Sequence, residues 1–313
     1  MTESYVPLVS IAMCTYNGER FLREQLDSLI AQDYPNLELI VVDDQSTDST
    51  FDILQEYEKK YPYIRTIQND KNIGFVRNFE KAIQHCTGEY IALCDQDDIW
   101  FPHKITTLVN NIGDAGLIYS QVKRIDEKGT LLDNDLIRSN SLEGKCHLNF
   151  LFKSGIPGHL CLMKKEVLSK ALPFPEGISF HDRWIIFITA ALCGIKAYPE
   201  VLSLHRKHGK NAALGINSRS GRSKCAKQKQ QFSECMTFLN AVLKSDCLSP
   251  EDRRLIEQVR EAYSKFPRCY SNRKLRKILI EHRDQLLQVY KDEQTAIKRL
   301  CYGLWKYRLR KFL

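Results

Sequence analysis

The N-terminal third of the chain alternates short, β-branched apolar segments with longer segments whose apolar residues recur at helical spacing. The first kind predicts strands at 8–14, 37–42, 64–67 and 90–93, and the second kind predicts helices at 19–31, 51–57 and 72–84. Strands that alternate with helices in this order form a parallel sheet with right-handed crossovers. We therefore expect an α/β fold in this part of the chain.

The strict alternation ends near residue 117. Residues 117–132 predict a hairpin with its turn at 127–129, because polar residues and a glycine separate two apolar segments. Further along, we expect a helix at 181–192 and a strand at 197–204. The second half of the sheet should therefore be less regular than the first.

A linker is predicted at residues 218–222, which read Ser-Arg-Ser-Gly-Arg. The sequence beyond the linker is rich in Lys, Glu, Gln, Leu and Arg, a composition typical of helices. We expect two parts: an α/β catalytic domain at 1–217 and a helical, basic C-terminal extension at 218–313.

Three carboxylates, Asp95, Asp97 and Asp98, directly follow the predicted strand at 90–93 in the segment CDQDDIW. Loops at the carboxyl ends of strands bind ligands in open α/β sheets. An Asp-x-Asp turn offers the oxygen ligands that Mg²⁺ and Mn²⁺ prefer, and a diphosphate can fill the open coordination positions. A solvated surface loop is the alternative. A second acidic pair, Asp43-Asp44, follows another predicted strand and favours a site for a metal ion and a nucleotide-bearing substrate.

The composition excludes several protein classes. The chain has 313 residues, is 43% hydrophobic and contains eleven cysteines without a CxxC pair, which favours reduced thiols over a disulfide framework or a zinc site. No segment reaches the ~18 apolar residues of a membrane-spanning helix, and the N-terminus lacks the pattern of a signal peptide. We expect a cytoplasmic protein, with Cys14, Cys94, Cys161 and Cys193 acting as small core residues.

The C-terminal segment 296–313, AIKRLCYGLWKYRLRKFL, carries six cations and no acid, interleaved with aromatic and aliphatic residues. Such a composition suits a helix that lies on anionic lipid as a peripheral membrane contact. A helix that packs its apolar side on the protein and exposes a basic side fits equally well. Nucleic-acid binding is not expected, because no recognised nucleic-acid motif accompanies the charge.

Four segments occur in a characteristic order: Thr15-Tyr16-Asn17 after the first strand, DDQSTDST at 43–50, Asn72-Ile73-Gly74, and the acidic cluster at 95–98. In this order they resemble the family 2 glycosyltransferases of GT-A fold, inverting enzymes that use nucleotide-sugars. The resemblance extends from about Val9 to Ala213. It implies a nucleotide-sugar site formed by Thr15, Tyr16, Asn17, Asp44, Asn72, Gly74, Asp95 and Arg206.

The same resemblance implies the remaining roles. Asp97 and His208 would hold Mn²⁺ or Mg²⁺, and Asp182 would be the catalytic base, although an ordinary surface histidine is the alternative for His208. Asp182 follows His181 where the family more commonly has Glu. This feature and a later segment, HRKHG at 205–209, resemble a bacterial rhamnosyltransferase-like branch. In that branch the later segment usually begins with Tyr, where this chain has His205, and carries Gln where this chain has Lys207.

The expected function is metal-dependent, inverting transfer of a sugar to a saccharide or lipid-linked acceptor in bacterial surface polysaccharide synthesis. The resemblance points to L-rhamnose from dTDP-rhamnose, and a UDP-hexose donor is the alternative. Two other classes remain: a phosphohydrolase with an aspartate nucleophile and a non-catalytic saccharide- or nucleotide-binding module. The first would carry its Asp-x-Asp pair early in the chain, whereas here it follows the fourth predicted strand.

Overall fold

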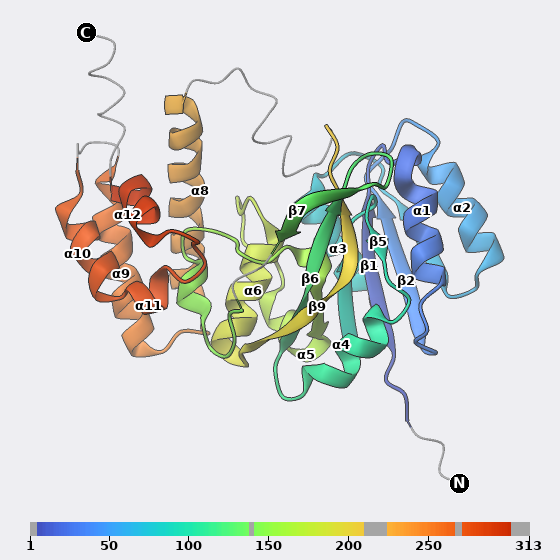
Figure 1. Ribbon diagram of the computed structural model, residues 1–313, viewed down its shortest axis with the longest axis horizontal. Helices are drawn as coiled ribbons and strands as arrows, with labels where there is room; N and C mark the ends of the chain where they lie inside the picture. The colour runs from blue at the N-terminus through green and yellow to red at the C-terminus, as the bar shows by residue number, and fades with distance from the viewer. Residues whose placement is uncertain (1–4, 138–140, 210–223, 267–270, 302–313) are drawn as a thin grey trace.

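A computed structural model describes residues 5–137, 141–209, 224–266 and 271–301, and a nine-stranded mixed sheet forms its centre (Figure 1). The strand order is β3-β2-β1-β4-β8-β6-β9-β5, and β7 pairs with β6. The strands are β1 (Val9–Thr15), β2 (Leu37–Asp43), β3 (Ile64–Gln68), β4 (Tyr90–Cys94), β5 (Ile99–Trp100), β6 (Leu117–Ile125), β7 (Leu131–Ile137), β8 (Cys161–Lys164) and β9 (Ile195–Arg206).

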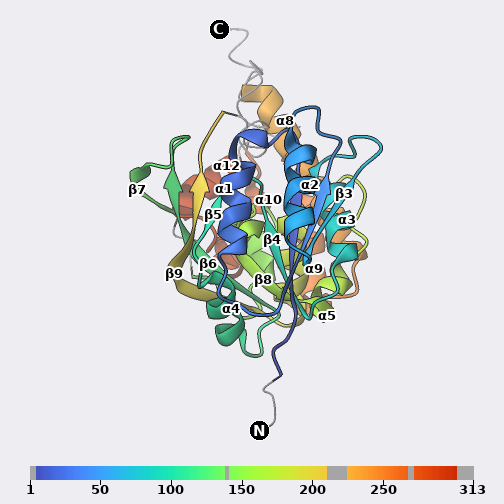
Figure 2. The same ribbon diagram turned by 90° about the vertical axis from the view of Figure 1, so that its right-hand side faces the viewer.

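The first four strands are parallel, as the alternating sequence predicts. Both faces of this part of the sheet are covered, which explains why its strands are almost continuously apolar. The helices of this half are α1 (Glu19–Ile30), α2 (Thr50–Lys60), α3 (Phe75–His85) and α4 (Lys104–Ile112). Helices α1, α2 and α4 share one hydrophobic cluster with Val9, Ile11 and Met13 of β1, and α1 and α2 lie side by side (Figure 2).

The opposite face of the sheet packs against α3 and α6 (His181–Leu192), where Ala12 of β1 meets Phe79 and Ile185 in a second cluster. Strand β8 is antiparallel to β4 and β6, so the sheet becomes mixed beyond β4. The predicted hairpin is confirmed as β6–β7. The short elements of this half are η1 (His147–Phe150), η2 (Gly158–Leu160), α5 (Lys165–Leu168) and η3 (Ser169–Ala171).

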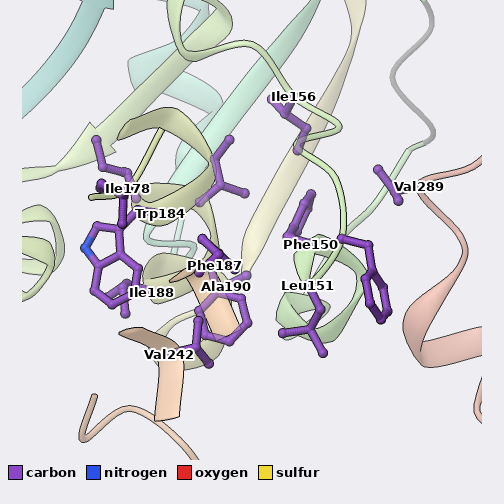
Figure 3. Close-up of a cluster of buried hydrophobic side chains, with 14 of the residues drawn as sticks. Phe150, Leu151, Ile156, Ile178, Trp184, Phe187, Ile188, Ala190, Val242 and Val289 are labelled. Atoms are coloured by element: carbon purple, nitrogen blue, oxygen red, sulfur yellow. The ribbon is translucent and has the colours of Figure 1, made fainter. Parts of the chain in front are cut away.

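The first of the C-terminal helices packs on α6, and the others pack on it, on η1 and on one another. They are α8 (Lys224–Lys244), α9 (Pro250–Ser264), α10 (Arg273–Glu281), α11 (Arg283–Leu286) and α12 (Glu293–Cys301). Phe238 of α8 lies 6.2 Å from Trp184 and 5.7 Å from Phe187, measured between ring centroids. Figure 3 shows Trp184, Phe187 and Ile188 in the same buried cluster as Val242 of α8. The helices therefore extend the core of the α/β part.

The expected boundary at 217 and the linker at 218–222 lie outside the described residues, as do residues 302–313 of the basic segment. Within the part of that segment that the structure describes, Ala296, Leu300 and Cys301 are buried among the C-terminal helices. The prediction of a core position is wrong for Cys193, which is exposed just after α6 ends. No helix of the described ranges is both long and apolar enough to cross a bilayer.

Candidate active site

The loops after β1 and β2 hold each other through buried polar contacts. Thr15 Oγ1 donates a hydrogen bond to Asp43 Oδ1 at 2.8 Å, across the parallel pair of strand ends. The backbone N–H of Asn17 donates to Ser46 Oγ at 2.8 Å, and Asn17 Oδ1 accepts from the Thr47 N–H at 2.8 Å. Asn17 has a φ of 47°, a left-handed conformation that asparagine tolerates better than most residues. Thr15 and Asn17 therefore shape this loop.

The Asp44 carboxylate orders the loop before α3. It accepts hydrogen bonds from the N–H groups of Ile73 at 2.8 Å and Gly74 at 2.9 Å. Gly74 has a φ of 82°, which favours glycine, and the space next to its Cα is open. Asn72 Nδ2 donates to the Asp44 carbonyl at 3.2 Å. The structure thus brings three of the predicted nucleotide-site residues together, while the contact of Asp44 with a base stays a prediction.

Tyr16 and the acidic loop are joined by Gln96, a residue whose role the sequence did not reveal. The Tyr16 N–H donates to Gln96 Oε1 at 2.9 Å, and Gln96 Nε2 donates to the Tyr16 carbonyl at 3.2 Å. A Cβ at Gly18 would lie 2.3 Å from Gln96 Oε1, so only glycine allows this approach. The Tyr16 residue is 49% exposed, which leaves its ring accessible to a ligand.

The three carboxylates of the acidic loop differ in their surroundings. The Asp95 side chain is 44% exposed, the Asp97 side chain is 11% exposed, and the Asp98 side chain is fully buried. Asp97 Oδ2 lies 2.6 Å from His208 Nε2, a hydrogen-bond distance, and their role as metal ligands stays a prediction. Burial raises the pKa of Asp97, although His208 opposes the shift. Asp95 is therefore the accessible acid of the loop, whereas Asp97 is nearly buried and Asp98 is fully buried.

Asp98 is held by two histidines from distant segments. Its Oδ1 lies 2.9 Å from His205 Nδ1, and its Oδ2 lies 3.4 Å from His159 Nδ1. Burial alone would raise the pKa of Asp98, but the charges of both histidines lower it to about 2. Burial alone would lower the pKa of His205, but the Asp98 carboxylate outweighs this effect and raises the pKa of His205 to about 9. The pair is an ion pair that fixes the loop.

His159 and Lys104 form a further support. Gly158-His159 belongs to the segments that resemble the rhamnosyltransferase-like branch, but the sequence did not reveal the contacts of His159. His159 Nδ1 lies 2.9 Å from Asp95 Oδ2, so one ring nitrogen faces two acids of the loop. The buried Lys104 ammonium donates to the His159 carbonyl at 2.7 Å and lies 3.6 Å from the Trp100 ring centroid. Burial lowers the pKa of Lys104 to about 8. Only the folded chain brings these groups together, because 55 residues separate Lys104 from His159.

Arg206 lies behind the acidic loop and is almost fully buried. Its Nε donates to the Asp97 carbonyl at 3.1 Å, and its Nη2 forms an ion pair with Glu24 of α1. Its guanidinium also lies 4.8 Å from the Phe21 ring centroid. In this arrangement Arg206 positions the loop, and the predicted contact with a diphosphate stays a prediction.

Asp182 is the second residue of α6 and lies near enough to the acidic loop to interact with Asp95. Burial raises its pKa to about 6, and the nearby Asp95 carboxylate adds to this shift. Ser154 Oγ lies 3.5 Å from Asp182 Oδ2, and the Cβ that Gly158 lacks would lie 3.2 Å from Asp182 Cβ. A partly buried carboxyl with this pKa can accept a proton near neutral pH.

His181, which stands where the family commonly has Glu, is buried against α3. Its ring stacks on Phe79 with a centroid distance of 4.1 Å, and burial lowers its pKa to about 4. Trp184 is also a core residue, and its Nε1 donates to the Ala171 carbonyl at 2.8 Å. Both residues anchor α6, which fixes the position of Asp182.

A divalent cation fits two groups of ligand atoms at this edge of the sheet. Asp97 with His208 offers an oxygen and a nitrogen that face each other, and the exposed Asp95 lies on the same loop. The ligand atoms of Asp98, His159 and His205 also lie within 4.8 Å of one another. Both groups are already joined by ion pairs, and the Asp97–His208 pair is the one whose residues the sequence predicts as metal ligands.

Comparisons with known proteins agree with this geometry. The model of the Glycosyl transferase family 2 matches residues 10–172. An uncharacterized glycosyltransferase of Haemophilus influenzae is 31% identical over 230 residues, which cover 67% of this chain and 69% of that protein. The putative glycosyltransferase EpsE of Bacillus subtilis is 42% identical over 100 residues, which cover 32% of this chain and 36% of that protein.

Solved structures share the fold at low sequence identity. TarS 1–349 of S. aureus in complex with UDP-GlcNAc has a TM-score of 0.61 at 18% identity, covering 94% of this chain and 82% of that chain. The mannosyltransferase PcManGT of Pyrobaculum calidifontis, in complex with GDP-Man and Mn²⁺, has a TM-score of 0.56 at 18% identity, covering 95% and 85% of the two chains. The chain therefore belongs to glycosyl transferase family 2 and is a glycosyltransferase of GT-A fold.

Proposed function

We propose that the protein transfers a sugar from a nucleotide-sugar to a hydroxyl acceptor with inversion at the anomeric carbon, and that Asp182 is the base. One observation carries this proposal: Asp182, in the first turn of α6, has a pKa raised to about 6 by burial, and the Asp95 carboxylate of the acidic loop lies near enough to add to this shift. A carboxylate hydrogen-bonded to the acceptor hydroxyl takes its proton as the oxocarbenium-like transition state forms. Attack from the face opposite the diphosphate inverts the centre.

The leaving diphosphate determines the role of the acidic loop. Asp97 and His208 would hold Mn²⁺ or Mg²⁺ beside the phosphates, with Asp95 directed to the ribose or to metal-bound water, and the bound cation would offset the negative charge that develops there. His159, His205 and Arg206 keep the loop in place through the contacts described above. Tyr16, whose backbone is held by Gln96, would contact the base, and Asp44 with residues 72–74 would form the rest of the nucleotide pocket.

For the donor, we favour dTDP-rhamnose. The support is the sequence resemblance of His181-Asp182 and residues 205–209 to the rhamnosyltransferase-like branch. The two neighbours that were solved with donors contain UDP-GlcNAc and GDP-Man, so a UDP-hexose is the competing donor. We further propose a saccharide or lipid-linked acceptor of bacterial surface polysaccharide synthesis, a cytoplasmic location, and contact of residues 296–313 with the inner face of the membrane.

A donor screen tests the proposal. The purified chain is incubated with Mn²⁺ or Mg²⁺ and with dTDP-rhamnose or the common UDP- and GDP-sugars, and nucleoside-diphosphate release is measured. We expect release from dTDP-rhamnose above all other donors. Release from a UDP-hexose alone would reject the rhamnose assignment but keep the reaction. If no donor releases nucleoside diphosphate and no metal-dependent nucleotide binding is detected, the result would support a non-catalytic binding module instead.

The pH dependence provides a separate prediction. Because the base must be deprotonated, kcat/KM should fall tenfold per pH unit below about 6, the pKa to which burial raises Asp182, and should level off above it. The rate is measured from pH 5 to 8 at saturating metal. An acid limb near the ordinary pKa of an aspartate, about 4, would contradict this assignment.

A further inference from the structure

Helix α10 has one buried face and one face that no described element covers. Leu275, Ile278 and Leu279 are buried in the core of the C-terminal helices. The opposite side of the helix presents Arg273, Arg276, Lys277 and Ile280, which recur at helical spacing and are all exposed. Ile280 is 50% exposed, one of few large apolar residues with that exposure among the described residues. We call these four residues the α10 face.

The charge of the α10 face is only partly neutralised. Lys277 Nζ lies 3.6 Å from Glu281, a partner one helical turn away. Among the described residues, no carboxylate oxygen lies within ion-pair distance of Arg273 or Arg276. Lys274, at the margin of the face, pairs with Glu261 of α9 at 2.9 Å. Two guanidinium groups thus remain available to an external anion.

Neighbouring segments carry the same charge. Helix α12 packs against α10 and adds Lys298 and Arg299, both exposed, in its last turn. The Cys301 carbonyl accepts a hydrogen bond from the Asn272 N–H at 2.8 Å, so the end of α12 lies next to the start of α10. Helices α10 and α12 therefore both carry exposed cations in this part of the chain.

We propose that the α10 face docks on an anionic phospholipid bilayer. Basic residues near such a surface are attracted by its negative potential, and an apolar residue among them can enter the headgroup boundary. Ile280 between the cations favours lipid over nucleic acid, because a phosphate backbone offers no apolar phase. Helix α10 lies at the opposite end of the molecule from α1 (Figure 1), whose Glu24 contacts Arg206, so docking leaves the acidic loop free. This surface is independent of the proposed donor and acceptor.

The test is co-sedimentation of the full-length protein with phosphatidylcholine vesicles, with and without phosphatidylglycerol. We expect binding only to the anionic vesicles, weakened by salt. The variant R273E/R276E/K277E should bind at least roughly a hundredfold more weakly, since each Lys or Arg near the surface contributes about fivefold. The matched control, K59E/K60E/R65E, reverses three exposed cations at α2 and β3 and should bind like the wild type.

Two further variants separate the alternatives. Ile280→Ser should weaken vesicle binding several-fold with the same salt dependence, because it removes the apolar contact alone. The variant K306Q/R308Q/R310Q/K311Q removes the charge of residues 302–313. When R273E/R276E/K277E is added to this variant, vesicle binding should weaken further. The proposal is overturned if reversal of the α10 face leaves vesicle binding unchanged, or if the wild type binds RNA but not vesicles. Sugar transfer to a soluble acceptor should be equal in all variants, which keeps this test distinct from that of the catalytic proposal.

Discussion

Replacement of Asp182 by Asn is expected to reduce kcat by roughly a thousandfold while donor binding stays nearly unchanged, because a positioned general base contributes about 10²–10⁴ in rate. The amide keeps the shape of the carboxyl but cannot accept the proton of the acceptor hydroxyl. Folding should not suffer. A carboxylate whose pKa is raised by folding destabilises the folded state above that pKa, so a neutral side chain removes a penalty at pH 7.

The measurement is steady-state transfer, together with donor binding by titration calorimetry. Asp52→Asn, in the exposed first turn of α2, serves as a matched control and should retain wild-type kinetics. Asp182→Asn should also lose the acid limb near pH 6. If kcat fell less than about tenfold, general-base catalysis by Asp182 would be excluded, since the whole effect assigned to it would be missing.

Replacement of Asp97 by Asn should abolish the metal dependence of donor binding and reduce kcat/KM by at least roughly a hundredfold, since even residues that only orient metal ligands contribute 10–100-fold. The reason is the position of Asp97, nearly buried and 2.6 Å from His208, where no other acid of the loop can replace it. Manganese affinity can be measured directly by electron paramagnetic resonance.

Chelation provides the internal comparison for this variant. Treatment with EDTA should bring the wild type down to the level of Asp97→Asn and should not lower the variant further. Nucleotide binding without metal should be equal in both proteins. If Asp97→Asn bound manganese as tightly as the wild type, the metal site would be assigned instead to the neighbouring group of Asp98, His159 and His205.

Much of the fold could be predicted because local patterns decide it. The helix at 181–192 was predicted with its observed bounds, since an uninterrupted apolar segment follows the polar residues at its start. The β6–β7 hairpin follows from its turn residues, and the position of the acidic loop follows from the strand before it. These features depend on neighbours in sequence, which periodicity and turn chemistry report.

The supports of the site could not be predicted in the same way. Gln96 contacts Tyr16 across 80 residues, and His159 contacts Asp95 across 64. Such pairs depend on the order of strands in the sheet, which no local pattern contains. Arg206 was expected to face a ligand, and only the packing of α1 shows that it is buried behind the loop. Cys193 was misjudged because its apolar neighbours in sequence do not show which side of the chain faces solvent just after α6.

The shared core of α6 and α8 has a consequence for how such enzymes can be recombined. Asp182 stands on a helix whose apolar side is completed by Phe238 and Val242, and Arg183 beside it also stacks on Phe238 at 3.7 Å. Exchange of the C-terminal helices with those of a relative would therefore change the surface against which the catalytic helix rests. A chimeric enzyme would need the α6 and α8 surfaces to come from the same parent.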